Sequence, residues 1–213
     1  MSEVKNEQEI FWSGEFGNEY ISRNKSDRLH ASNLYLFSKI FDRTQGVDSI
    51  SEFGCNIGMN LKAIRELSPV AELHGYEINK LALTYLAETQ PDVITHHQSI
   101  LEEINLAADL TFTKGVLIHI QPENLSVVYD NLYRNSSRYV LVAEYYDPKP
   151  VTLKYRGHHN KMFKEELGFD LMFLHAYRLA IEHPETNEVM QFQANPPAAW
   201  NLALEKLGFI TRF

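Results

Sequence analysis

The fold is decided by the stretch Ser49-Ile50-Ser51-Glu52-Phe53-Gly54-Cys55-Asn56-Ile57-Gly58. Its first part, Ser49 to Phe53, is short, follows Val47 and carries apolar residues at Ile50 and Phe53, which predicts a short buried strand. Gly54 and Gly58 then bracket a tight turn, and residues 59–67 predict a helix because their apolar positions recur at helical spacing. A strand, a glycine turn and a helix in this order indicate the nucleotide-binding corner of a doubly wound α/β sheet.

The turn offers bare backbone to a ligand, because glycine has no side chain and tolerates positive φ. The helix that follows adds unpaired N–H groups at its start. The turn differs from the dinucleotide fingerprint Gly-x-Gly-x-x-Gly, since it reads Gly-x-x-x-Gly with Glu52 two residues before the first glycine. A purely structural turn is the alternative interpretation.

An acidic residue stands at the tip of the next predicted strand, 71–76. Glu77 follows the glycine turn by about 20 residues, the interval at which a carboxylate accepts both hydroxyls of a ribose. Ile78 is its neighbour, and Ser99-Ile100 follows a short third strand at 93–96, where folds of this type contact an adenine ring. The alternative for Glu77 is a solvated surface carboxylate.

Strand and helix patterns continue to alternate, with helices at 79–88 and 121–135 and strands at 108–113 and 139–143. This predicts a Rossmann-like, doubly wound, mostly parallel sheet in one compact unit, residues 46–213. Residues 1–45 form an N-terminal helical cap that includes a helix at 29–41. In the tail we expect an apolar strand-like run at 173–181, a helix at 198–207 and an edge strand or tail at 208–213.

Ligands of such sheets bind beyond the carboxyl ends of the strands. The residues that fall there are Lys114, Gly115, His119, Glu144, Tyr145 and Tyr146. Lys114 can pair with a carboxylate, and His119 has a side chain suited to general base catalysis. The alternative for His119 is a residue that packs or caps a helix.

Two further segments carry candidate contacts. Residues 7–24 are rich in aromatic side chains and include Trp12, Tyr20 and Asn24, which suggests either a lid over the pocket or a hydrophobic cap without ligand contact. Tyr155, Arg156 and His158 form a polar, basic cluster that suits a carboxylate or phosphate on a substrate. A solvated loop is the alternative for that cluster.

Composition excludes several classes of protein. The chain has 213 residues, enough for one α/β domain, and its net charge of -8 argues against a nucleic-acid groove. Its single cysteine, Cys55, excludes an internal disulfide framework and predicts a cytoplasmic protein with no reactive thiol. No apolar run approaches the roughly 20 residues of a membrane helix. His96 and His97 point to opposite faces of a strand, so we expect no metal.

Three segments resemble the pseudaminic acid biosynthesis-associated methylases, a branch of the class I S-adenosylmethionine (SAM) methyltransferases. They run from Phe11-Trp12-Ser13-Gly14-Glu15-Phe16-Gly17-Asn18-Glu19-Tyr20 to Asn24, over residues 52–63, and from Ala143-Glu144-Tyr145-Tyr146-Asp147-Pro148-Lys149-Pro150 to Lys164. Residues 114–120 fit as well, and Asn56 stands where the middle glycine of the family motif is commonest. The similarity covers roughly residues 9 to 165, beyond which the chain departs from the family pattern.

The resemblance implies a SAM-dependent methyltransferase with S-adenosylhomocysteine (SAH) as product. It also implies a small-molecule acceptor, a nonulosonic (sialic-acid-like) sugar or its precursor for surface glycans. Gly54, Cys55, Asn56 and Gly58 would hold the methionine moiety, Glu77 and Ile78 the ribose, Ser99 and Ile100 the adenine, and Lys114 and Gly115 the sulfonium end. His119, Tyr145 and Tyr146 would be catalytic, Tyr155, Arg156 and His158 would bind the acidic sugar, and Trp12, Tyr20 and Asn24 would close the lid.

Three other functions are compatible with the pattern. The first is a non-catalytic module that binds the cofactor as a partner of a glycan enzyme. The second is a nucleotide-dependent oxidoreductase, which the missing third glycine disfavours. A methyltransferase of an unrelated small metabolite is the third possibility, because the resemblance identifies a pathway and no acceptor atom.

Overall fold

The computed structural model describes residues 6–22 and 25–144 with their side chains. It also describes the backbone of five strands in the remainder, 151–155, 158–164, 173–174, 178–182 and 189–193. Within these residues, none of the helices has the length and hydropathy needed to cross a membrane.

The main sheet has the strand order β3-β2-β1-β4-β5-β8. Its parallel strands are β1 (Ser49–Phe53), β2 (Glu72–Glu77), β3 (Ile94–His97), β4 (Ala108–Lys114) and β5 (Ser136–Ala143). Strand β8 (Phe173–Leu174) pairs antiparallel with β5. The predicted doubly wound, mostly parallel sheet is confirmed, and β5 begins three residues earlier than the apolar pattern indicated.

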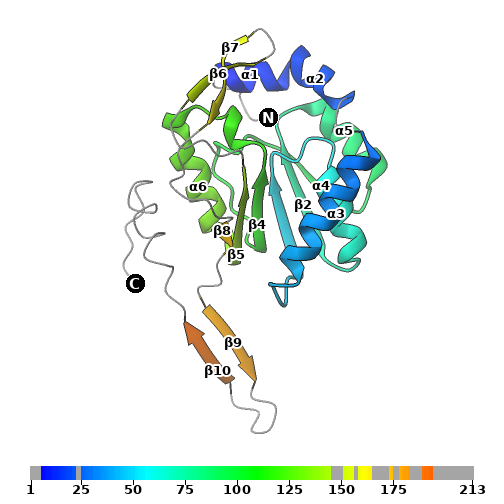
Figure 1. The fold of residues 1–213 in the computed structure, drawn as a ribbon, viewed down its shortest axis with the longest axis vertical. Coiled ribbons are helices and arrows are strands. Elements are labelled where there is room, and N and C mark those ends of the chain that lie inside the picture. Colours follow the sequence, from blue (N-terminus) through cyan, green and yellow to red (C-terminus); the bar gives the residue numbers. More distant parts are fainter. Residues whose placement is uncertain are drawn as a thin grey trace.

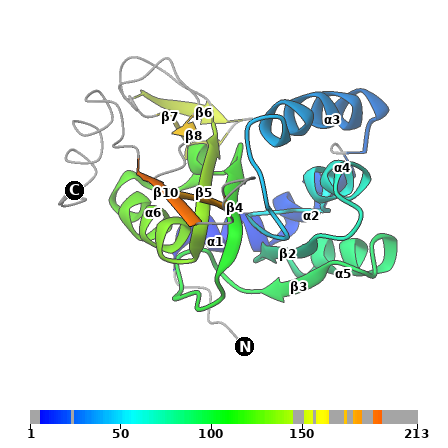
Figure 2. The same cartoon turned by 90° about the horizontal axis from the view of Figure 1, so that it is seen from below.

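Helices cover both faces of this sheet (Figure 2). Helices α3 (Asp27–Phe41), α4 (Met59–Leu67) and α5 (Lys80–Thr89) pack on one face through a core that includes Phe37, Leu61 and Leu86. Helix α6 (Leu125–Arg134) packs on the other face, where Val128 and Leu132 contact Phe53 and its neighbours. The two cores bury the strands on both sides, and the run from Tyr139 to Ala143 in β5 is continuously apolar, as expected for a strand covered on both faces.

Two short helices, α1 (Glu7–Ser13) and α2 (Glu15–Ile21), lie across the upper end of the sheet in Figure 1. Asn6 begins α1 with a capping box, in which its side chain accepts from the Glu9 backbone N–H and the Glu9 carboxylate accepts from the Asn6 N–H. Gly17 permits the close approach of α1 and α2, because a Cβ there would lie 1.8 Å from the Trp12 carbonyl oxygen.

The second half of the chain differs from the expectation in one respect. The apolar run 173–181 was predicted as one strand, and this is wrong, since it contributes to two sheets. Its first part is β8, whereas β9 (Arg178–Glu182) pairs with β10 (Val189–Gln193) in a separate hairpin. Apolar character alone does not show where a chain changes its pairing partner. The helix and edge strand predicted at 198–213 lie outside the described residues.

The polar segment after β5 contains an antiparallel hairpin, β6 (Val151–Tyr155) and β7 (His158–Lys164). Strand β7 lies close to the 3-10 turn η2 (Leu117–His119), which follows β4. The hairpin therefore returns towards the same end of the sheet as α1 (Figure 1).

Candidate functional site

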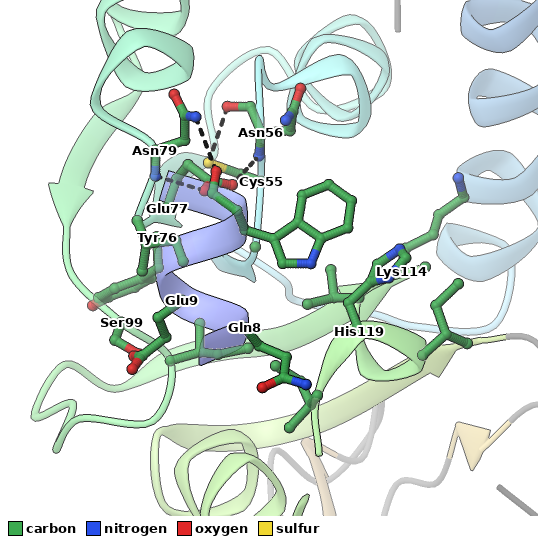
Figure 3. Close-up of a pocket in the computed structure, with 18 of the residues that line it drawn as sticks. Gln8, Glu9, Cys55, Asn56, Tyr76, Glu77, Asn79, Ser99, Lys114 and His119 are labelled. Atoms are coloured by element: carbon green, nitrogen blue, oxygen red, sulfur yellow. Dashed lines mark hydrogen bonds between the residues drawn. The ribbon is translucent and has the colours of Figure 1, made fainter. Parts of the chain in front are cut away.

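A cavity of about 630 Å³ opens at the carboxyl ends of the parallel strands (Figure 3). It is lined by the glycine turn after β1, by the ends of β2, β3 and β4, and by residues of α1, α2 and α3. This is the edge at which ligands bind in open α/β sheets, and the volume lies within the range of small-molecule sites.

The glycine turn has a left-handed backbone at three positions. Gly54 has φ 81°, Gly58 has φ 74°, and Asn56 has φ 49°. Asparagine tolerates this region better than most residues. A Cβ at Gly58 would also lie 2.4 Å from a methyl group of Leu86, so packing as well as backbone conformation requires glycine there. Helix α4 then begins at Gly58 without a side-chain cap, which leaves the first N–H groups of the helix available at the cavity wall.

Glu77 is held rigidly at the tip of β2. Its exposed fraction is 9%, and the two carboxylate oxygens accept from the backbone N–H of Asn56 at 2.9 Å and of Asn79 at 2.8 Å. Burial raises the pKa of Glu77, while the backbone hydrogen bonds from Asn79, Asn56 and Ile78 act in the opposite direction. Glu77 is therefore a buried carboxylate at the cavity wall, and the alternative of a solvated surface residue is wrong.

The part of the cavity wall beside β3 is formed by Ile78, Ser99 and Ile100. Ser99 is buried, and its hydroxyl donates to the carboxylate of Glu9 from α1. Beneath this region the Tyr76 ring stacks on His96 with centroids 4.3 Å apart. The part of the chain described with side chains holds no cluster of His, Cys, Asp and Glu that could bind a metal ion.

Lys114 and Gly115 form the opposite end of the cavity, next to β4. Gly115 has φ 69°, which turns the chain sharply out of the strand. Figure 3 shows the Lys114 side chain extending away from Glu77 towards α3. His119 follows in η2 with an exposed fraction of 8%, and its ring lies 4.3 Å from the ring of Trp12. His119 therefore both lines the cavity and packs against α1.

Glu144, at the end of β5, supports the turn that carries His119. Its carboxylate accepts from the Val116 N–H at 2.9 Å and from the Thr113 hydroxyl at 3.3 Å. Burial raises the pKa of Glu144 to about 7. The carboxylate is not part of the cavity wall, so its contribution is to fix the backbone of the turn.

Helices α1 and α2 form a lid that contacts the site directly. Trp12 and Tyr20 line the cavity. The lid is anchored by the Asn79 side chain, whose Nδ2 donates to the Trp12 carbonyl oxygen at 3.0 Å and to Asn18 Oδ1 at 2.9 Å. The aromatic segment thus lies over the cavity and contributes Trp12 and Tyr20 to its lining.

Several predicted site residues lie outside the described part of the chain: Asn24, Tyr145, Tyr146 and Arg156. For Tyr155 and His158 the backbone alone is described, and these two residues pair with each other in the β6–β7 hairpin. Cys55 lines the cavity, where burial raises the pKa of its thiol well above the ordinary value. A raised pKa disfavours the thiolate, which is the reactive form of cysteine.

The structure adds polar residues that were not among the predicted site contacts. Glu52 is fully buried beneath the turn, and its Oε1 accepts from Asn60 Nδ2 at 2.6 Å. Asn60 and Asn33 line the cavity, and each has a buried Oδ1 without a hydrogen-bond partner. Asn60 stands two residues after Gly58, so its position next to the glycine turn could have marked it as a candidate contact. Asn33 comes from a helix that precedes the sheet, and no local signal marks it.

No family model matches the sequence, and a search of curated proteins finds no match. Solved structures do match. The plantazolicin methyltransferase BpumL in complex with SAH superposes with a TM-score of 0.54 at 17% identity, covering 65% of this chain and 57% of that one. Magnesium protoporphyrin IX methyltransferase from Synechocystis PCC 6803 with bound SAM gives a TM-score of 0.56 at 9% identity, covering 76% and 98%.

Coclaurine N-methyltransferase bound to N-methylheliamine and SAH gives a TM-score of 0.55 at 13% identity, covering 68% of this chain and 48% of that one. The chain thus spans a little over half the length of the plantazolicin enzyme and about half that of the coclaurine enzyme. At these identities the similarity concerns the fold. The chain has the fold of the class I methyltransferases.

Proposed function

We propose that the protein is a SAM-dependent methyltransferase that acts on a small-molecule acceptor. The observation that carries the proposal is the position of Glu77, which backbone N–H groups of the glycine turn and of the segment before α5 hold at the cavity wall. A carboxylate oxygen accepts more than one hydrogen bond, so Glu77 retains the capacity to accept the two hydroxyls of a ribose. The structural neighbours bind SAM or SAH, which agrees with this assignment.

The other end of the cavity suits the methionine moiety. Asn33 and Asn60 line this end of the cavity, and their carboxamide groups are of the kind that accepts from an ammonium group, which supplies three donors. The N–H groups at the start of α4 and the cation of Lys114 are suited to the carboxylate of the same moiety. The polar groups present therefore match a zwitterionic amino acid with a ribose at its side.

The sulfonium of SAM, when bound, supplies an activated methyl group. The chain then has to place the acceptor in line with this methyl group and to remove one proton. His119 is the candidate base, since its ring lines the cavity next to the sulfonium end. The Trp12 ring packs against His119, and in this position it would reduce the access of water to that end of the site.

For the acceptor we propose a nonulosonic sugar or its precursor. The resemblance of residues 11–24, 52–63 and 143–164 to the pseudaminic acid-associated methylases supports this class. Of the basic cluster, Tyr155 lies in β6 and His158 lies in β7, and β7 lies close to the turn that carries His119. An acidic sugar bound by this cluster would have its hydroxyls near the candidate base.

Isothermal titration with SAM, SAH and NAD tests the cofactor. We expect SAM and SAH to bind and NAD not to bind. Glu77→Ala should weaken SAH binding roughly tenfold to hundredfold or more, because hydrogen bonds to a charged group contribute about 1.5–3 kcal/mol each. Glu72→Gln, at the exposed start of the same strand, is the matched control and should bind like the wild type.

Unchanged SAH affinity in Glu77→Ala would refute the ribose assignment, and equal binding of NAD would favour an oxidoreductase. The acceptor is tested separately, by measuring SAH formation from SAM with nonulosonic acids and their neutral precursors. Binding of SAM without turnover on any sugar would contradict the acceptor class and leave a cofactor-binding module or another metabolite.

A further inference from the structure

The strand order determines where the nucleobase of the ligand would lie. In the sheet, β1 with its glycine turn, β2 with Glu77, and β3 lie side by side in the order β3-β2-β1. A ligand with its amino acid at the turn and its ribose at Glu77 therefore places its base beside the end of β3. There the cavity is lined by the apolar side chains of Ile78, Ile100 and Leu101, which suit the faces of an aromatic ring.

Among the described residues of the lid, Glu9 brings a charged side chain to this end of the cavity. Glu9 lies on α1, has an exposed fraction of 6%, and lines the cavity beside Ser99 (Figure 3). Its Oε2 accepts from the Asn6 N–H at 3.0 Å in the capping box, and its Oε1 accepts from the Ser99 hydroxyl. The carboxylate is thus fixed at both oxygens by groups of the protein.

The neighbouring Ser99 is engaged in both directions. Its hydroxyl donates to Glu9 and accepts from the Leu101 N–H at 3.1 Å. Ser99 therefore orients Glu9, and the carboxylate keeps the capacity to accept a further hydrogen bond, because each of its oxygens has more than one acceptor position.

We infer that Glu9 recognises the exocyclic 6-amino group of the adenine and selects it against a 6-oxo purine. The inference rests on the proposed function, because it requires an adenosine ligand in this cavity. An amino group donates to a carboxylate, whereas the carbonyl of hypoxanthine places a second acceptor against it. Glu9 also belongs to the lid, so recognition of the base takes place as α1 covers the site.

The test compares SAH with S-inosylhomocysteine, which carries a 6-oxo group in place of the amino group. Both are titrated into the wild-type protein, Glu9→Gln and Glu7→Gln by calorimetry. We expect the wild type to prefer SAH roughly tenfold to hundredfold, the effect of one charge-assisted hydrogen bond. In Glu9→Gln the preference should fall close to one, because a carboxamide can donate to the oxo group as well as accept from the amino group. Glu7→Gln makes the same change on the exposed side of α1 and should retain the preference.

Glutamine can also complete a capping box, so Glu9→Gln preserves the start of α1. If this variant fails to fold, Ser99→Ala removes the hydroxyl that orients Glu9. It should weaken SAH binding and leave S-inosylhomocysteine binding unchanged. A wild type without preference, or a Glu9→Gln variant that keeps the wild-type preference, overturns the inference while SAH binding still supports the proposed function. Absence of binding by either ligand refutes both.

Discussion

Glu52→Gln should make the protein more stable at alkaline pH and leave its stability almost unchanged in acid. Glu52 lies in the central strand β1 with an exposed fraction of 1%. Its Oε1 accepts from Asn60, but its Oε2 is buried without a hydrogen-bond partner. Burial raises the pKa of Glu52 from 4.5 to about 8, against the smaller opposing effects of the Asn60 hydrogen bond and of Lys114.

The size of the effect follows from this pKa. Between pH 4.5 and about 8 the folded protein keeps the proton while the unfolded chain has lost it. Stability therefore falls as pH rises through this window, by about 1.4 kcal/mol per pH unit. The full shift corresponds to about 5 kcal/mol, which is an upper bound, and the interval from about pH 5.5 to 8 accounts for about 3 kcal/mol of it. Glutamine cannot ionise, so the variant lacks this loss.

Urea denaturation of the unliganded wild type and Glu52→Gln at about pH 5.5, 7 and 8.5 measures the difference. The free energy of unfolding of the variant should exceed that of the wild type by an amount that grows with pH. Glu88→Gln, on the exposed side of α5, controls for the loss of a surface charge. A constant difference between wild type and Glu52→Gln across this range would show that Glu52 is already ionised in the folded protein and would refute the reasoning.

Three further predictions concern the site. His119→Ala should reduce methyl transfer roughly a hundredfold or more while SAH affinity by calorimetry stays close to wild type, because the imidazole acts on the acceptor proton. Asn79→Ser should increase hydrogen exchange in residues 7–21 and weaken SAH binding about tenfold, because serine keeps the helix cap of α5 but loses both amide contacts to the lid. Gly58→Ala should lower the free energy of unfolding in urea by about 1–3 kcal/mol, because its φ of 74° is left-handed and its Cβ meets Leu86.

Each of these has an outcome that contradicts it. Wild-type turnover in His119→Ala would refute the assignment of His119 as the general base. Unchanged hydrogen exchange in the lid of Asn79→Ser would show that other contacts hold α1 and α2. For Gly58→Ala the double variant with Leu86→Ala separates the two causes. The double variant lacks the collision of the added methyl group at position 58 with Leu86 but keeps the backbone strain at residue 58. If its free energy of unfolding equals that of Leu86→Ala alone, the left-handed conformation contributes nothing to the loss of stability.

The sheet and the centre of the site could be predicted because their signals are local. The glycine turn and Glu77 lie on consecutive units of strand and helix, and the strand order then brings them together at one edge. The boundaries of β1 and α4 follow directly from the apolar pattern and the glycines, and the structure places both elements at the predicted residues.

The lid contacts could not be predicted in the same way. Glu9 and Ser99 are separated by 90 residues, and nothing in either neighbourhood marks the pair. Asn33 reaches the cavity only because α3 packs against α4. Such contacts depend on how the helices and strands pack against one another. The periodicity of apolar residues in one sequence does not contain that information.

Asn79 joins two parts of the site that have different tasks. Its backbone N–H holds the carboxylate that we assign to the ribose, and its side chain holds the lid. A ligand that shifts Glu77 must therefore alter the lid, and a closed lid stabilises the orientation of Glu77. Ligand binding at Glu77 and closure of the lid are then linked by one coupling free energy. Binding favours closure by the same amount by which closure favours binding. We expect the residence time of the product to depend on the opening of α1 and α2, so that the slow step of a catalytic cycle would be the departure of SAH.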